Sequence, residues 1–298
     1  MHDDQLRELV QTRARRPEAI AEAAAARRRP PSVLDGDGRI MVIAADHPAR
    51  GSLGAGPQPL AMADRKDLLD RLCLALSRPG MTGVLGTPDI IEDLLLLGAL
   101  DDKVVFGSMN RGGLAGASWE IDDRFTAYDA ATLAAMGYEG GKMLTRIDLE
   151  DPATAATVEA CSRAVSELAE RRLVAMVEPF MARRVDGRLR TELTTEAAIR
   201  ASAISAGLGT TSAYTWLKVP VVDDMERVAG ATTLPTVLLG GEVKEDQDAA
   251  FDAWRTALAV PNVIGLVIGR SLLYPPDGDV SAAVDAAVSL LPTPSVRS

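Results

Sequence analysis

The 298-residue chain is poor in aromatic residues, cysteine and histidine: aromatic residues make up 4%, and there are two cysteines and two histidines. The widely spaced Cys73 and Cys161 form neither a disulfide framework nor a metal motif. His47 is the only histidine besides His2, and one histidine does not supply a usual zinc or two-histidine iron site. We therefore expect no bound metal ion and no other cofactor.

Long hydrophobic runs are also missing. No run approaches the ~18 apolar residues of a membrane span, and the first residues, MHDDQLRELV, lack the apolar centre of a secretion signal. We expect a cytoplasmic protein with no membrane partner. The net charge of −10 does not favour binding to the negatively charged backbone of nucleic acid. One cluster of arginines lies near the start of the chain and contains Arg13, Arg15, Arg16, Arg27, Arg28 and Arg29. It could contact nucleic acid or a membrane surface, but the favoured interpretation is a helix and linker whose arginines lie in solvent.

The 47% of hydrophobic residues are mostly aliphatic and fall into short runs separated by amphipathic stretches. This alternation predicts strands followed by helices, joined by right-handed crossovers into a parallel sheet. Eight such strands close most naturally into a (β/α)8 (TIM) barrel. A doubly wound open sheet is the alternative, but its usual GxGxxG turn is absent. The runs cover residues 40–46, 81–87, 103–108, 138–145, 172–179, 212–220, 234–241 and 262–269.

Three segments lie outside this repeat. Residues 4–26 predict one helix that the RRRPP stretch at 27–31 ends, so residues 1–31 form an N-terminal helix and linker and residues 32–298 the barrel domain. The helix would cap the bottom of the barrel or pack on a neighbouring subunit in a homo-oligomer. Residues 47–62 and 183–195 predict long loops after the first and fifth strands, where active-site lids occur.

Charged residues stand at the carboxyl ends of several predicted strands, where barrel enzymes bind substrate. Lys218 falls within the apolar segment AYTWLKVP. Desolvation there lowers the pKa of the lysine and frees its amine to attack a carbonyl, and a second cation at Lys142 lowers it further. A single lysine in such a strand could equally serve a buried ion pair. Two lysines together with Asp46 and Glu178 favour catalysis.

The last two strands end in glycine. Gly240–Gly241 and Gly269, followed by Arg270, would present backbone N–H groups and a guanidinium at the usual phosphate site of a barrel. Alternatively, the glycines only make tight turns. We expect His47 to line the pocket rather than act as an acid or base. Lys244 would add positive charge to the site or lie in solvent.

Six motifs follow one another over about residues 40–274: AADHPARG, GGKMLTRID, VAMVEPFM, TWLKVPV, LLGGEV and GLVIGRSLLY. Together they resemble the class I, Schiff-base aldolases of the tagatose-bisphosphate and archaeal-type fructose-bisphosphate aldolase superfamily, which includes deoxyribose-phosphate aldolases. A narrower resemblance is to the aldolase-like (β/α)8 proteins associated with inositol catabolism in actinobacteria. The sequence departs from the pattern of these aldolases at two places that bear on the substrate. Pro48 follows Asp46–His47, and Val219–Pro220–Val221 follow Lys218.

The resemblance implies that Lys218 forms an imine and that Lys142 is the second active-site lysine. Either Glu178 or Asp46 would act as the general base. The implied substrate is a small phosphorylated sugar or keto-deoxy sugar acid, such as 2-deoxy-5-keto-gluconate 6-phosphate in inositol catabolism. The alternatives are a deoxyribose-phosphate aldolase, another imine-forming lyase, a transaldolase-like or dehydratase activity, and a sugar-phosphate-binding barrel without turnover. The implied phosphate site contains Gly240, Gly241, Gly269 and Arg270.

Overall fold

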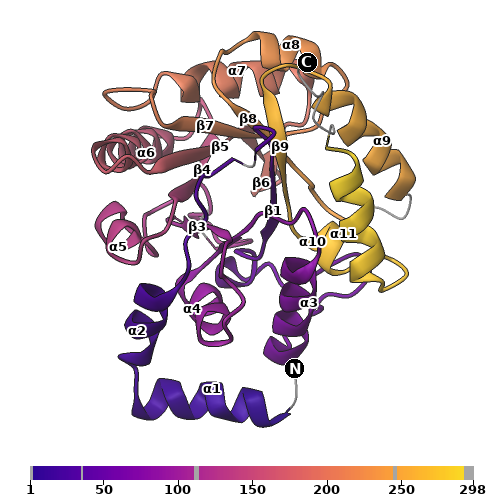
Figure 1. The fold of residues 1–298 in the computed structure, drawn as a ribbon. Helices are drawn as coiled ribbons and strands as arrows, with labels where there is room; N and C mark the ends of the chain where they lie inside the picture. Colours follow the sequence, from indigo (N-terminus) through magenta and orange to yellow (C-terminus); the bar gives the residue numbers. More distant parts are fainter. Residues whose placement is uncertain (1–2, 35, 111–113, 244–246, 292–298) are drawn as a thin grey trace.

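The computed structural model describes residues 3–34, 36–110, 114–243 and 247–291. Eight parallel strands form a closed barrel (Figure 1), in which each strand pairs with the next and the last pairs with the first. The predicted (β/α)8 barrel is therefore confirmed. Its strands are β1 (Ile40–Ala44), β2 (Gly83–Gly86), β3 (Val104–Ser108), β4 (Gly140–Ile147), β5 (Val174–Val185), β7 (Thr215–Pro220), β8 (Thr236–Leu239) and β9 (Val263–Ile268).

Helices surround the barrel, and several begin at an aspartate or threonine whose side chain accepts a hydrogen bond from a backbone N–H of the first turn. Cys73 and Cys161 lie in two of these helices. The helices are α3 (Arg65–Ser77), α4 (Pro88–Leu96), α5 (Ala130–Ala135), α6 (Ala153–Glu170), α7 (Thr195–Ala206), α8 (Met225–Gly230), α9 (Gln247–Leu258), α10 (Arg270–Leu273) and α11 (Val280–Ser289).

The hydrophobic core has an inner and an outer part because successive strand residues point to opposite faces. Val42 packs with the residues inside the barrel, whereas Ile43 packs with those between strands and helices. Phe106 and Trp216 meet inside the barrel with their ring centroids 6.1 Å apart. Since Lys218 follows Trp216 by two residues, its side chain also points into the barrel, one step nearer the carboxyl end of β7.

The N-terminal segment contains two helices, α1 (Asp3–Arg15) and α2 (Ala19–Ala26), so the single helix expected over residues 4–26 is wrong. The break falls at Pro17, which has no backbone N–H to donate. Helix α1 lies outside α4 at the periphery of the barrel (Figure 1). Within the described ranges, no helix combines the length and the apolar character that crossing a membrane requires.

Part of the arginine cluster attaches these helices to the barrel rather than lying in solvent. Arg13 donates a 2.7 Å hydrogen bond to Asp93 of α4. Arg27 is 7% exposed and pairs at 3.0 Å with Glu139, which stands just before β4. The solvated interpretation therefore fails for Arg27, because this guanidinium is buried against the amino-terminal end of the barrel.

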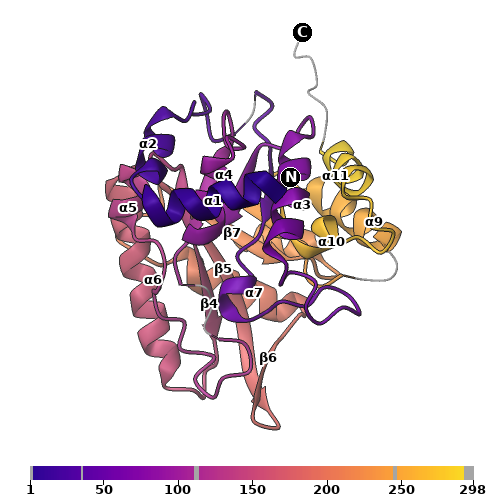
Figure 2. The ribbon, with the colours of Figure 1, turned by 90° about the horizontal axis from the view of Figure 1, so that it is seen from below.

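The polar loop expected at residues 183–195 is also wrong. Strand β5 continues to Val185, and the chain then returns as the antiparallel strand β6 (Arg188–Thr191). The two turn residues, Asp186 and Gly187, have φ values of 50° and 74°, the positive values that tight hairpin turns require. Figure 2 shows this hairpin extending away from the barrel.

Candidate active site

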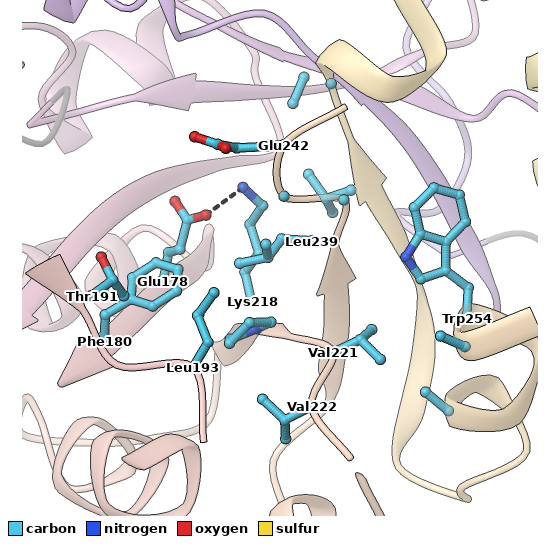
Figure 3. A pocket seen from close by; sticks show the side chains of 18 of the residues that line it. Glu178, Phe180, Thr191, Leu193, Lys218, Val221, Val222, Leu239, Glu242 and Trp254 are labelled. Atoms are coloured by element: carbon cyan, nitrogen blue, oxygen red, sulfur yellow. Dashed lines mark hydrogen bonds and ion pairs between the residues drawn. The ribbon is translucent and has the colours of Figure 1, made fainter. Parts of the chain in front are cut away.

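A cavity of about 1410 Å³ opens at the carboxyl ends of the barrel strands. It reaches beyond the barrel mouth to an apolar region beside α9, where Trp254 lies away from the Lys218 amine (Figure 3). All the site residues predicted from the sequence lie on its wall. They are Asp46, His47, Lys142, Glu178, Lys218, Gly240, Gly241, Gly269 and Arg270.

Lys218 is the fourth residue of β7 and is 5% exposed. Its amine donates to Glu178 Oε1 over 2.7 Å, a contact visible in Figure 3. Burial lowers the pKa of Lys218 below the ordinary lysine value, the Glu178 carboxylate opposes that shift, and the neighbouring charge of Lys142 adds to it. The geometry therefore holds a lysine amine that loses its proton more readily than a lysine in water.

Glu178 on β5 contacts both lysines, because its other oxygen, Oε2, pairs with the amine of Lys142 on β4. The Lys142 amine also lies 3.0 Å from Asp46 Oδ2 at the end of β1. The four groups form a buried row of alternating charge, Lys218–Glu178–Lys142–Asp46. Such alternation is the condition under which charges are stable in an interior of low dielectric constant.

The alternation sets the pKa values of the row. Although burial opposes ionisation, Lys142 and Lys218 lower the pKa of Glu178 to about 2. Lys142 likewise holds the pKa of Asp46 well below its usual range, against the effect of burial. Burial lowers the pKa of Lys142, but Asp46 and Glu178 raise it by more, so the pKa lies above the ordinary lysine value. Lys142 is thus the permanent cation, and Lys218 is the lysine that can become neutral.

Two polar residues at the end of β3 support the row and were missed in the sequence. Ser108 donates from its hydroxyl to Asp46 Oδ2 over 3.3 Å. Asn110 donates to the Leu144 carbonyl at 2.6 Å and accepts from the Leu144 N–H at 2.9 Å, which holds β4 beside it. Their position just after an apolar strand was the available signal, because that is where barrel active sites draw their residues.

The glycines at the ends of β8 and β9 have backbone reasons for their identity. Gly241 has φ +67°, a left-handed conformation that favours glycine. A Cβ on Gly269 would lie 2.6 Å from the Ala44 carbonyl oxygen, so β1 leaves no room for a side chain. Arg270 donates to the Gly54 carbonyl at 3.3 Å. Lys244 is outside the described residues.

His47 lies on the wall as a neutral imidazole. Burial lowers the pKa of His47 to about 3; the Asp46 carboxylate opposes this shift, and the charge of Arg270 adds to it. Its Nδ1 is 3.9 Å from Asp46 Oδ1, too far for a hydrogen bond. Arg50, at the end of the 3-10 turn η1 (Pro48–Arg50), also lines the cavity and was missed, because no pattern marks one arginine in a long loop as facing inward.

The other side of the mouth holds a second charged group that sequence reasoning missed. Arg146 of β4 is 5% exposed and donates to Asp123 Oδ2 at 3.1 Å and to Glu120 Oε1 at 2.9 Å. Its charge is therefore matched by carboxylates of the segment before α5. Among the described residues, no group of three or more histidine, cysteine, aspartate or glutamate side chains is arranged to hold a metal ion.

Comparison with solved structures gives a near relative and more distant barrels. The crystal structure of Cgl0159 from Corynebacterium glutamicum is 52% identical, with 98% of each chain covered and a TM-score of 0.95. A Schiff-base-forming fructose-1,6-bisphosphate aldolase is 16% identical, with 92% of this chain and 100% of that chain covered and a TM-score of 0.65. The fructose-bisphosphate aldolase from Slackia heliotrinireducens is 13% identical, with 91% and 89% covered and a TM-score of 0.63.

At such low identity the two aldolases share the fold with this chain, and fold alone does not carry function. Among curated proteins, none matches the chain. The model of one family, described as Cgl0159-like, matches residues 38–288 and so spans the barrel from β1 to α11. The chain belongs to the Cgl0159-like family of (β/α)8 barrel proteins.

Proposed function

We propose that the protein is a class I aldolase that cleaves or forms a carbon–carbon bond of a phosphorylated sugar or keto-deoxy sugar acid through an imine on Lys218. One observation carries the proposal: a buried lysine amine with a lowered pKa stands 2.7 Å from a carboxylate in the cavity of a barrel. A desolvated lysine of this kind is the nucleophile that attacks carbonyl carbons.

In the first step, the neutral amine of Lys218 adds to the substrate carbonyl and gives a carbinolamine. Loss of water then leaves a protonated imine. Glu178, which accepts a hydrogen bond from this nitrogen before the reaction, takes the proton that Lys218 loses on becoming neutral and returns it to the carbinolamine hydroxyl, which leaves as water. Lys142 stays charged and compensates Glu178 and Asp46, so the row keeps its balance while Lys218 reacts.

In the second step, the bond beyond the neighbouring carbon breaks and its electron pair moves into the imine, which becomes an enamine. The leaving carbon becomes an aldehyde when a base removes the proton of its hydroxyl group. Glu178 and Asp46 are the two candidate bases. Glu178 is the better placed, because it contacts Lys218 directly, whereas Asp46 contacts Lys142 and Ser108.

The same arrangement favours an enzyme over a sugar-phosphate-binding barrel without turnover. Binding of a phosphate needs only the glycines at the ends of β8 and β9 and the guanidinium of Arg270. A buried row of two lysines and two carboxylates costs desolvation energy that binding alone does not require. We propose that this enzyme acts in the cytoplasm on a phosphorylated carbohydrate. The most specific form of the proposal is a role in inositol catabolism.

A retro-aldol screen tests the proposal. Phosphorylated ketoses, keto-deoxy sugar acid phosphates and deoxyribose phosphate are incubated with the wild type and with Lys218→Ala, and released aldehyde is measured. We expect cleavage of at least one class by the wild type and none above background by Lys218→Ala. Full activity of Lys218→Ala would refute the imine mechanism, and cleavage of deoxyribose phosphate alone would favour that alternative substrate.

A further inference from the structure

Several buried polar atoms on one side of the cavity have no hydrogen-bond partner among the described residues. They are Arg50 Nε, His47 Nδ1 and Arg270 Nε of the cavity wall, with Ser271 Oγ of the residue that follows Arg270. A buried donor without an acceptor costs free energy, so a group of them at one place indicates a ligand that completes their hydrogen bonds. Ser271 is 4% exposed, and its hydroxyl lies 2.9 Å from the position that a Cβ on Gly240 would take.

These atoms come together because the turn after β1 packs on the start of α10. A Cβ on Gly269 would lie 2.8 Å from His47 Cε1, so the turn leaves no space above this glycine. Arg270 donates to the carbonyl of Gly54 in the same loop. The Arg50 carbonyl in turn accepts a 2.9 Å hydrogen bond from the Ala115 N–H, which holds the end of the turn from the other side.

The charges point to an anion. Among the described residues, no carboxylate forms an ion pair with either Arg50 or Arg270, in contrast to Arg146 in the same cavity. Burial lowers the pKa of Arg270, the Glu242 carboxylate raises it, the charge of Arg50 lowers it, and Asp46 raises it. Two guanidiniums that repel one another without a shared carboxylate form a site that a phosphate dianion stabilises, since it accepts hydrogen bonds from both.

We propose that Arg50 and Arg270 together bind the phosphate of the substrate, with Ser271 and the backbone at Gly240–Gly241 completing the site. This proposal rests on the proposed function. It adds that the phosphate is held by the loop after β1 as well as by the ends of β8 and β9. Arg50 is thus a specificity residue that selects phosphorylated over unphosphorylated carbonyl compounds.

Titration of inorganic phosphate by calorimetry tests the site without any reaction. Arg50→Gln is compared with the wild type and with Arg183→Gln, a matched loss of charge at an exposed arginine of the hairpin that does not line the cavity. We expect Arg50→Gln to weaken phosphate binding about 10-fold or more, as for hydrogen bonds to a charged group. Arg183→Gln should bind within about twofold of the wild type, because salt screens distant exposed charges.

Equal binding by Arg50→Gln and the wild type would overturn the proposal, and so would an equal loss in Arg183→Gln. Arg50→Lys is titrated in the same way, so that the proposal is still tested if Arg50→Gln does not fold. It keeps the charge but not the planar donor geometry, and we expect a smaller loss than in Arg50→Gln.

Borohydride trapping with two ketones tests whether the anion is the ester phosphate of the substrate. Arg50→Gln should raise the concentration of dihydroxyacetone phosphate needed for half-maximal trapping and leave that of dihydroxyacetone unchanged. An equal rise for both ketones would overturn the inference. If neither ketone is trapped by the wild type, the imine function fails, while the phosphate titration still decides whether Arg50 binds the anion.

Discussion

Glu178 accepts a 2.7 Å hydrogen bond from Lys218, and its second carboxylate oxygen contacts Lys142. One carboxylate therefore holds two amines whose pKa values move in opposite directions, downward for Lys218 and upward for Lys142. The difference follows from the second carboxylate, because Asp46 lies 3.0 Å from Lys142 and makes no ion pair with Lys218 among the described residues. The site thereby separates a reactive lysine from a permanently charged one.

Imine formation should follow the ionisation of Lys218. Its rate, measured by borohydride trapping, is expected to rise with pH around a midpoint below the ordinary lysine value of about 10.4. Glu178→Gln removes the carboxylate that most raises this pKa, so the midpoint should move lower. Glu242→Gln, which changes an exposed carboxylate of the same cavity, should leave it unchanged. A higher midpoint in Glu178→Gln would contradict the assignment.

The Glu178 carboxylate should also give the fold a specific acid sensitivity. Its pKa is about 2 in the folded protein, below the value of about 4.3 expected in the unfolded chain. A group with a lowered pKa stabilises the fold above its unfolded pKa, and this stability is lost as pH falls through the folded value. The advantage of the wild type over Glu178→Gln in urea unfolding should be complete at pH 7 and shrink between about pH 4.3 and pH 2. A difference independent of pH would count against the carboxylate.

Removal of the permanent cation should destabilise the barrel. Lys142→Met leaves Asp46 with no lysine partner and Glu178 with Lys218 alone, and breaking a buried pair in this way costs about 3–5 kcal/mol. Lys103→Met is the matched control, because Lys103 is half-buried and donates to the carbonyl of Met81 rather than to a carboxylate. It should cost about 1 kcal/mol. Equal losses in urea unfolding would show that the charged row contributes nothing particular to stability.

The N-terminal segment offers a second comparison of buried and exposed pairs. Arg27→Met removes the guanidinium that pairs with buried Glu139 and should cost about 3–5 kcal/mol. Arg28→Met removes an exposed pair with Asp102 and should cost far less, because water and salt screen the two charges. Thermal unfolding of both variants checks the difference. A larger loss in Arg28→Met would mean that Arg27 does not anchor this segment.

The barrel and its central charges could be predicted from the sequence because both rest on short-range patterns. Eight apolar runs in strand–helix order allow few topologies, and closure brings the carboxyl ends of the strands to one face. Asp46 and Lys218 stand at or near such an end, and Lys142 and Glu178 lie within β4 and β5, which continue beyond them; all four line one cavity once the barrel closes. The contacts among them depend on strand register, which the sequence does not display.

What sequence reasoning missed depends on tertiary packing or on a signal that was passed over. Arg50 faces the cavity only because the turn after β1 packs on Gly269. Ser108 gains importance from a contact with Asp46, which lies 62 positions away along the chain. The β5–β6 hairpin did carry a signal, since Asp186–Gly187 is a common hairpin turn, but its flanking arginines obscured the strand pattern.

The most direct test of the account is to locate the trapped adduct. The protein is incubated with dihydroxyacetone phosphate, reduced with borohydride, digested, and its lysine-containing peptides are identified by mass spectrometry. The account predicts one reduced adduct on Lys218, none on Lys142, and none in Lys218→Ala. An adduct on Lys142, or an unmodified Lys218 in an enzyme that still cleaves its substrate, would contradict the central claim.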